Sequence, residues 1–242
     1  MRGDGVRRSL NKGNIIELGI KTIMGIFTAI SIVSISTIMV LNMKFIYKFI
    51  IEKYNLVSVT GVSSNDLFFN YSKIINYLQN PFDSKLSLPN FVMSDYGEIH
   101  FKEVKDIFTV LIIISIIFLI FVSSYIAFSK IKNRKEFKIN IINTLNLGAN
   151  ILICFFCFII TAIVIDFSKA FILFHKIVFN NDYWIFEPSI DPIINALPEE
   201  LFMIYGLIIL AIVMSISVII KINKRKIVKG RVLSSSSKIR VK

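Results

Sequence analysis

The sequence is poor in the residues that most often carry out chemistry. Its 242 residues include two cysteines, two histidines and one tryptophan. It has no G-x-S-x-G nucleophile elbow, no Walker-type glycine loop, and no H-E-x-x-H or H-x-x-x-H spacing. These absences argue against an α/β-hydrolase, a P-loop nucleotide enzyme and a zinc protease.

The two cysteines, Cys154 and Cys157, stand in an apolar stretch, C-F-F-C. In a soluble protein this spacing would suggest redox or metal chemistry. Here neither a histidine nor an aspartate is close by in the sequence. We therefore expect both thiols to act as small apolar packing groups, not as nucleophiles.

Long runs of apolar residues make up much of the sequence. Hydrophobic residues make up 55% of the chain and the mean hydropathy is +0.69. A hydrocarbon core of about 30 Å takes roughly 20 helical residues to cross, and backbone groups in lipid must pair internally. We therefore predict an all-α membrane protein with four transmembrane helices, at about 22–43, 107–129, 149–174 (an apolar core at 149–165 with an extension) and 201–220.

Charge is unevenly placed along the chain. Most of the 28 lysines and arginines lie in the first 21 residues, in 130–138 and in the tail 221–242, whereas acidic residues equal or outnumber the lysines in 44–106 and 175–200. The positive-inside rule then places both termini and the basic tail 221–242 in the cytoplasm, with 44–106 and 175–200 outside. The tail is suited to anionic lipid headgroups and lacks the aromatic residues that stack on RNA bases, so we expect membrane lipids and no nucleic acid as partners.

The outer segment 44–106 has a helical pattern of its own. Ser63 and Asp66 have the spacing of a helix start. Apolar residues follow at helical spacing, so we expect an amphipathic helix that lies on the membrane surface. The two outer segments together predict a small extracellular cap; the whole chain forms a single membrane domain. The apolar positions favouring this helix are Leu67, Tyr71, Ile74, Ile75 and Leu78.

Two pairs of opposite charges stand near the ends of predicted spans. Glu17 and Lys21 are four residues apart and can pair on the cytoplasmic side. Asp166 and Lys169 interrupt the third span near its outer end. We interpret the second pair as an interfacial ion pair, with a role in shaping a site as the alternative.

The two histidines are expected at the same membrane surface. His100 stands seven residues before the second span and His175 follows the third, so both reach the outer face although they are 75 residues apart. An imidazole with a pKa near 6.5 is a usable base at neutral pH. Of two imidazoles, one can act as the general base and the other as the general acid. The pattern leaves open which of them is the base. Ordinary interfacial side chains are the alternative.

A zinc site is a competing hypothesis for the same residues. Zinc usually takes at least three protein ligands, and Asp182 and Glu103 would have to complete the set. Because no zinc-binding spacing connects these residues, we expect no metal and no other cofactor.

At these histidines the sequence resembles the bacterial lipoprotein intramolecular transacylase family, membrane enzymes of low-GC Gram-positive bacteria. His100 is followed by Glu103-Val104-Lys105, where the family has His-x-x-Asp-Val. His175 is followed by FNNDYWIFEPSIDPIINALPEELF, in which the N-D-x-W, P-S-x-D-P and L-P-E elements match. The similarity spans about 15–222. Glu103 departs from the family's aspartate by one methylene.

The resemblance implies an acyltransferase reaction. Its substrate is a lipoprotein whose N-terminal cysteine carries diacylglycerol. The sn-2 acyl chain moves to the α-amino group of that same cysteine, which gives the lyso-form. The resemblance further implies four transmembrane helices with an extracellular cap, and it assigns catalysis to His100 and His175. Because the nucleophile motifs are missing, we expect these histidines to act in acid–base roles without a covalent nucleophile.

Aromatic and amide side chains near the histidines are candidates for positioning the substrate. We expect Tyr183, Trp184 and Phe186, with Phe101 beside His100, to form walls that fold it; an interfacial aromatic belt is the alternative. Asn181 and Asp182 are expected to position a histidine or the ester carbonyl, with loop capping as the alternative. Glu103 is retained as a further positioning candidate.

Two other classes of function remain open from the sequence. One is an intermolecular acyltransferase or lipase acting on phospholipid, which would release a lysophospholipid. The other is a non-catalytic membrane scaffold or small transporter. A transporter favours broken helices with charges at mid-membrane, whereas the only interruption here, at 166–169, is near one end.

Overall fold

The computed structural model describes residues 12–132 and 135–239, and the described chain is almost entirely helical. The described part holds no β-strand. Its elements are α1 (Lys12–Leu41), α2 (Phe45–Lys53), α3 (Leu56–Thr60), α4 (Ser64–Gln79), α5 (Asp95–Lys132), α6 (Lys135–Ile165), α7 (Phe167–Val178), the 3-10 helix η1 (Pro192–Ala196) and α8 (Glu199–Ile239).

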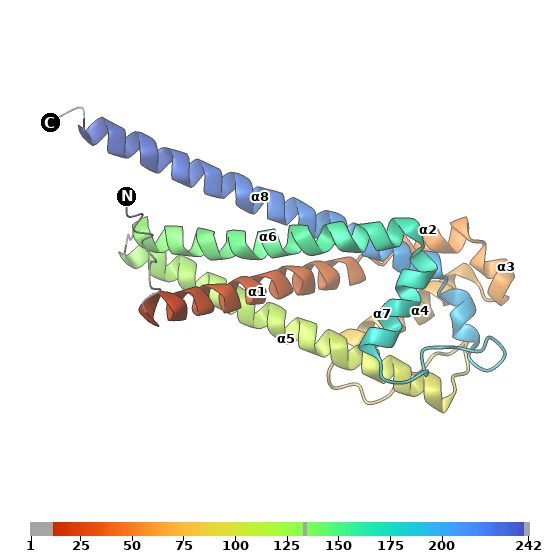
Figure 1. Ribbon diagram of the computed structural model, residues 1–242. Coiled ribbons are helices and arrows are strands. Elements are labelled where there is room, and N and C mark those ends of the chain that lie inside the picture. Colours follow the sequence, from red (N-terminus) through yellow and green to blue (C-terminus); the bar gives the residue numbers. More distant parts are fainter. Residues whose placement is uncertain (1–11, 133–134, 240–242) are drawn as a thin grey trace, which may run out of the picture.

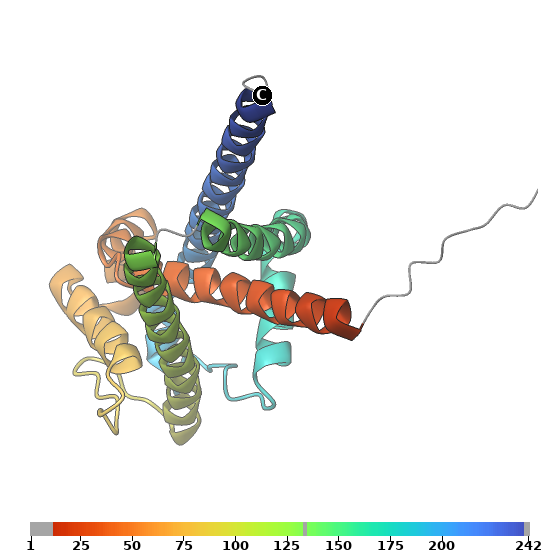
Figure 2. The same ribbon diagram turned by 90° about the vertical axis from the view of Figure 1, so that its left-hand side faces the viewer.

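Four of these helices are long and apolar enough to cross a membrane, which confirms the predicted class of multi-pass helical membrane protein. The candidate spans are Ile15–Leu41, Asp95–Tyr125, Ile141–Ile165 and Glu199–Gly230. In Figure 1 they run along one another, with the start of α1 and the end of α8 at the same end. Figures 1 and 2 both show α8 leaving the others toward its C-terminal end.

The bundle is held by apolar packing among α1, α6 and α8. Six buried residues form its core: Ala29, Ile32, Leu152, Phe156, Leu210 and Val213. Helices α1 and α6 approach closely at Gly25 and Gly148, because a Cβ on Gly148 would lie 2.9 Å from the Gly25 carbonyl oxygen. Small residues permit such approach in membranes. Cys154 and Cys157, which the sequence suggested are small apolar packing groups, are exposed on α6 and take no part in this core.

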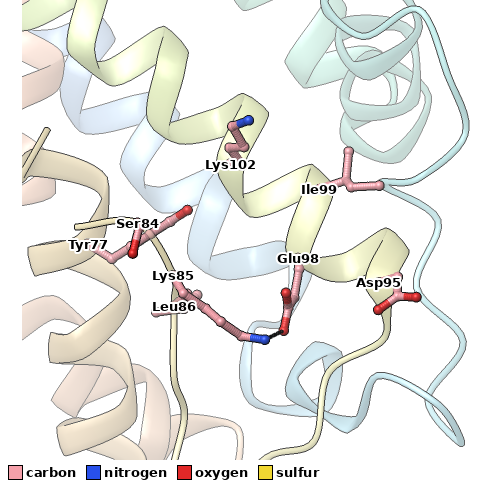
Figure 3. Close-up of a pocket in the computed structure, with 8 residues that line it drawn as sticks. All are labelled: Tyr77, Ser84, Lys85, Leu86, Asp95, Glu98, Ile99 and Lys102. Carbon is pink, nitrogen blue, oxygen red and sulfur yellow. Dashed lines mark ion pairs between the residues drawn. The ribbon is translucent and has the colours of Figure 1, made fainter. Parts of the chain in front are cut away.

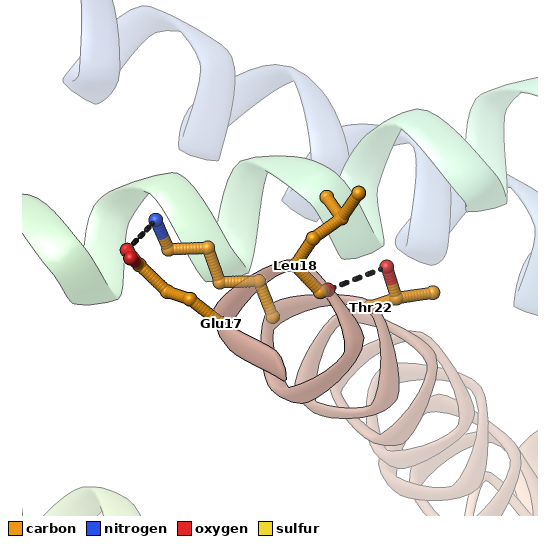
Figure 4. Close-up of polar contacts among 4 residues, drawn as sticks. Glu17, Leu18 and Thr22 are labelled. Atoms are coloured by element: carbon orange, nitrogen blue, oxygen red, sulfur yellow. Dashed lines mark hydrogen bonds and ion pairs between the residues drawn. The ribbon is translucent and has the colours of Figure 1, made fainter. Parts of the chain in front are cut away.

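The N-terminal part of α1 carries the predicted ion pair. Lys21 Nζ lies 2.5 Å from Glu17 Oε1, one helical turn apart, as Figure 4 shows beside the Thr22–Leu18 hydrogen bond. Both partners are exposed, so this pair contributes little to stability. The basic residues Arg2, Arg7 and Arg8 lie outside the described residues.

The third predicted span, 149–174, is two helices instead of one. Helix α6 ends at Ile165, and α7 begins after Asp166, whose backbone is extended (φ −164°, ψ 100°). The Asp166 carboxylate accepts a hydrogen bond of 3.0 Å from the Lys169 backbone N–H, which caps α7. The sequence pair interpreted as an ion pair is therefore also a helix start, and α7 turns away from the axis of α6 (Figure 1).

The last helix is longer than the span predicted within it. Helix α8 does not end near 220 but continues through Ile239. At 1.5 Å per residue, its 41 residues extend about 60 Å, twice a hydrocarbon core of about 30 Å. Residues 221–239 of the predicted basic tail thus continue this helix.

The cap packs as a folded unit on the end of the bundle opposite the C-terminal end of α8 (Figure 1). Ser63 caps α4, since the Asp66 N–H donates to Ser63 Oγ at 3.2 Å, as the spacing predicted. The apolar face of α4 is buried inside the protein, so the prediction that this face lies on the membrane was wrong. Tyr71 shows why: its hydroxyl is 2.5 Å from that of Tyr205 on α8, which ties the cap to the bundle.

Candidate active site

The two histidines come together where α5 and α7 meet. His100 lies in the second turn of α5 and His175 in the last turn of α7. Their ring centroids are 6.1 Å apart with an interplanar angle of 37°. Each side chain is only 9% exposed. Elements separated by 75 residues of sequence thus build one buried pair of imidazoles.

Aromatic rings surround both imidazoles. Phe179 and Phe186 make T-shaped contacts with His100, with centroids at 4.8 and 5.5 Å. His175 packs against Phe171, Trp184 and Phe179 at 4.2, 4.9 and 5.6 Å, respectively. These rings exclude water from the pair, so a proton on either imidazole is less well solvated than in water.

The tautomer of His175 follows from its hydrogen bond. Nδ1 lies 2.8 Å from the Phe171 carbonyl oxygen, one turn earlier on α7. A carbonyl only accepts, so Nδ1 carries the proton and the neutral ring keeps its lone pair on Nε2. Burial lowers the pKa of His175, and the Phe171 carbonyl, which favours the protonated ring, partly opposes this. His175 is therefore neutral at pH 7, with Nε2 as its base.

A carboxylate, an amide and an indole connect the two halves of the site. Asn181 Nδ2 donates to Glu103 Oε1 at 2.7 Å, and the Asn181 carbonyl accepts from Trp184 Nε1 at 3.0 Å. Glu103 is one turn beyond His100 on α5, and the Trp184 ring packs against the ring of His175. Among the described residues, no group bonds to the buried Glu103 Oε2 or to the buried Nδ1 of His100.

Other residues expected at the site are less close to the histidines. The Tyr183 ring stacks on Tyr96 at 4.7 Å. Asp182 is exposed, and its contact within the described chain is a backbone one, in which its carbonyl accepts from Ile185 N–H. Phe101 is buried in the core of the cap, with its ring centroid 6.2 Å from that of His100 and 5.8 Å from that of Phe186.

Comparison with known proteins identifies the family of this chain. The family model described as "Lipoprotein intramolecular transacylase Lit" matches residues 22–202. The chain belongs to this family. No protein with a curated description matches it at a significant level.

Solved structures of Lit from Bacillus cereus have the same fold. One of them is 32% identical to this chain with a TM-score of 0.77, and the match covers 92% of this chain and 100% of the other. Two more carry a histidine substituted by arginine or by alanine. They match at 29% and 30% identity, with TM-scores of 0.69 and 0.66; each match covers 92% of this chain and 99% or 97% of the other.

Within this Lit-family site, the structure adds two aromatic residues that the sequence reasoning missed. Phe171 and Phe179 precede and follow His175 by four residues, so all three share one face of α7 and its end. That i, i+4, i+8 spacing was visible in the sequence. Phe171 also supplies the carbonyl that fixes the His175 tautomer.

Asp191 joins the loop after α7 to the start of α5. This side chain, 4% exposed, accepts hydrogen bonds of 2.7 Å from both the backbone N–H and the hydroxyl of Ser94. Ser94 immediately precedes α5, and a Cβ on Gly97 would lie 2.7 Å from Asp191 Oδ1. Asp191 therefore fixes the helix end that carries His100.

A separate cavity of about 230 Å³ lies elsewhere on α5, toward α4, and Figure 3 shows its lining. Lys85 and Glu98 form an ion pair of 2.7 Å there. Neither histidine lines it. No group of three His, Cys, Asp or Glu side chains within residues 12–132 and 135–239 is arranged to hold a metal ion.

Proposed function

We propose that this Lit-family protein moves the sn-2 acyl chain of a diacylglyceryl-modified lipoprotein to the α-amino group of the same N-terminal cysteine. The product is the lyso-form, with an N-acyl group and one remaining ester on the glyceryl moiety. The observation that carries the proposal is the pair of buried imidazoles, His100 and His175, with centroids 6.1 Å apart. Family membership supplies the acyltransferase class.

The proposed chemistry is a proton transfer coupled to ester aminolysis. The free α-amine, with a pKa near 7.7–8.0, is largely protonated at pH 7. His175 Nε2 takes a proton from nitrogen, and the amine lone pair attacks the sn-2 ester carbonyl carbon. The C–N bond forms, the nitrogen loses a second proton, and an imidazolium delivers one proton to the departing glyceryl alkoxide as the ester C–O bond breaks. The other proton passes to water, so the ammonium ends as an amide with one N–H bond, and no energy-rich cofactor is consumed.

The aromatic enclosure supports the intramolecular route. Both reacting groups belong to one molecule, so holding them together supplies effective molarity worth several kcal/mol. Trp184 and Phe186 present rings to the two histidines, and they would fold the substrate so that its amine meets its own ester.

We place the reaction at the outer membrane surface. The histidines lie at the end of the bundle that carries the cap, away from the end of α8. The far end of α8 carries a cluster of basic residues, and such clusters are retained in the cytoplasm. They are Lys221, Lys224, Arg225, Lys226 and Lys229.

The test is mass spectrometry of the N-terminal lipopeptide of a lipoprotein, incubated with the purified protein in detergent. Acid–base groups contribute about 10²–10⁴ to a rate, so we expect His100→Ala and His175→Ala each to slow lyso-form production by about 100-fold or more. Lys176→Ala is the matched control, because Lys176 is the exposed neighbour of His175.

Two results would reject the proposal. Lyso-form production at the wild-type rate by both histidine variants would remove the imidazole pair from the mechanism. Release of a lysophospholipid, with the lipoprotein gaining a third chain, would show an intermolecular reaction on phospholipid instead.

A further inference from the structure

The carboxylate of Glu103 is only half satisfied in the structure. Oε1 accepts a hydrogen bond of 2.7 Å from Asn181 Nδ2. Oε2 is buried and has no partner among the described residues. A buried charged oxygen without a hydrogen bond is unfavourable, so this atom is a ready acceptor for a donor that the described chain does not supply.

The negative charge of Glu103 is also uncompensated. Among the residues that the structure describes, no Lys, Arg or His nitrogen lies within ion-pair distance of it; the ion pairs found are elsewhere. Lys105, two residues on, is committed otherwise: its Nζ donates to the Asp83 carbonyl and lies over the Tyr77 ring. The free oxygen is thus suited to a cation from outside the chain.

The position of Glu103 places such a cation close to both histidines. It lies three residues after His100, so both side chains extend from the same side of α5. Through Asn181 it connects to Trp184, which packs on His175 at 4.9 Å. A cation on Glu103 would therefore sit beside the imidazoles.

We propose that Glu103 Oε2 binds the α-ammonium group of the substrate's N-terminal cysteine. This inference rests on the proposed function, which supplies a substrate with that group. An ammonium has three N–H donors: one bonds to Glu103 and another reaches an imidazole nitrogen. When the imidazole takes its proton, the amine still donates to Glu103 and its freed lone pair turns to the ester carbonyl. Glu103 selects substrates whose N-terminal amine is free.

Matched substitutions separate this role from a structural one. In Glu103→Gln, the side-chain oxygen can still accept from Asn181, but the negative charge is gone. In Asn181→Ala, the charge remains and the tie to the Trp184 loop is lost. If Glu103 only holds the loop, Asn181→Ala is the variant that should lose binding of the free amine. If Glu103 binds the ammonium, Glu103→Gln is the variant that should lose it.

The experiment measures binding of two ligands that cannot react. Both are dialkylglyceryl lipopeptides with ether-linked chains, one with a free α-amine and one N-acetylated, titrated into the full-length protein in nanodiscs. A charge-assisted hydrogen bond is worth about 1.5–3 kcal/mol, which is a preference of tenfold or more for the free amine. We expect the wild type and Asn181→Ala to show it, and Glu103→Gln to bind both ligands equally.

Two outcomes overturn the inference. One is a Glu103→Gln protein that keeps the amine preference, and the other is a wild type without any preference. Thermal unfolding of each variant checks that it is folded, and Glu103→Asp, which keeps the charge, should retain the preference if Glu103→Gln unfolds. Lyso-form production by the same wild-type preparation is measured in a separate assay. Absence of that product would reject the proposed function, whereas loss of the amine preference alone would reject this inference.

Discussion

At the residue scale, His175 shows how packing prepares a side chain for proton transfer. Its hydrogen bond to the Phe171 carbonyl places the proton on Nδ1 and leaves Nε2 free. The surrounding rings remove water, which disfavours the charged form. In the folded protein the imidazole is therefore a neutral base at a pH where an exposed histidine is already partly protonated.

The titration of His175 tests this directly. Burial lowers its pKa, so its midpoint should lie below the ordinary value of about 6.5, and it should stay neutral as the pH falls through 6.5. NMR of protein with ¹³C-labelled histidine gives the midpoint, because the chain has two histidines and His100→Gln leaves one signal. A midpoint at or above 6.5 would contradict the account.

At the element scale, the site depends on how two helix ends are fixed. Helix α5 is held by Asp191 at Ser94, and α7 is started by Asp166 at its first turn. Each contact orients the helix that carries one histidine. The distance between the two imidazoles therefore depends on Asp191 and Asp166, whose carboxylates contact neither ring.

Removal of the Asp191 carboxylate should loosen α5 and separate the histidines. Two hydrogen bonds to Ser94 are lost in Asp191→Ala, so we expect a cost of about 1–3 kcal/mol in stability and a fall of roughly tenfold in turnover. Gly97→Ala, which crowds Asp191 Oδ1, should act in the same direction. Thermal unfolding and turnover measure both effects.

Ser189→Ala is the control for these substitutions, because Ser189 is an exposed residue of the same loop. If Asp191→Ala matched this control in both stability and turnover, the tie between the loop and α5 would not position His100.

The sequence predicted the elements better than it predicted their ends. Hydrophobic length located four spans, and charge placed His100 and His175 at the same face. The interruption at Asp166 was predicted but the new helix that starts there was not, because one carboxylate can be a lipid-surface ion pair or a helix cap, and the choice depends on backbone angles. The contacts of Asn181 with Glu103 and Trp184 were also beyond the sequence, since they depend on how the loop after α7 folds back on α5.

At the scale of the whole molecule, the fold separates a site from its membrane anchor. Four helices cross the bilayer, the cap closes one end, and the histidines lie between the two parts. A lipid-modified substrate keeps its acyl chains in the bilayer while its cysteine amine reaches the surface. On the proposed function, a site at this junction would meet both reacting groups.

The proposed orientation is tested by cysteine labelling of intact cells. In a protein with Cys154→Ala and Cys157→Ala, a single cysteine is introduced by Ser189→Cys in the cap or by Lys229→Cys near the far end of α8; both positions are exposed. A membrane-impermeant thiol reagent should label the first and reach the second only after permeabilisation. The reverse pattern would contradict an outer site.

The most direct test of the central claim is a crossover experiment. Two diacylglyceryl lipopeptides that differ in both peptide mass and acyl-chain length are mixed with the purified protein, and the products are analysed by mass spectrometry. Intramolecular transfer predicts that each peptide carries only its own original chain on nitrogen, and that His100→Ala and His175→Ala suppress both products. Peptides bearing the other substrate's chain on nitrogen would contradict the account.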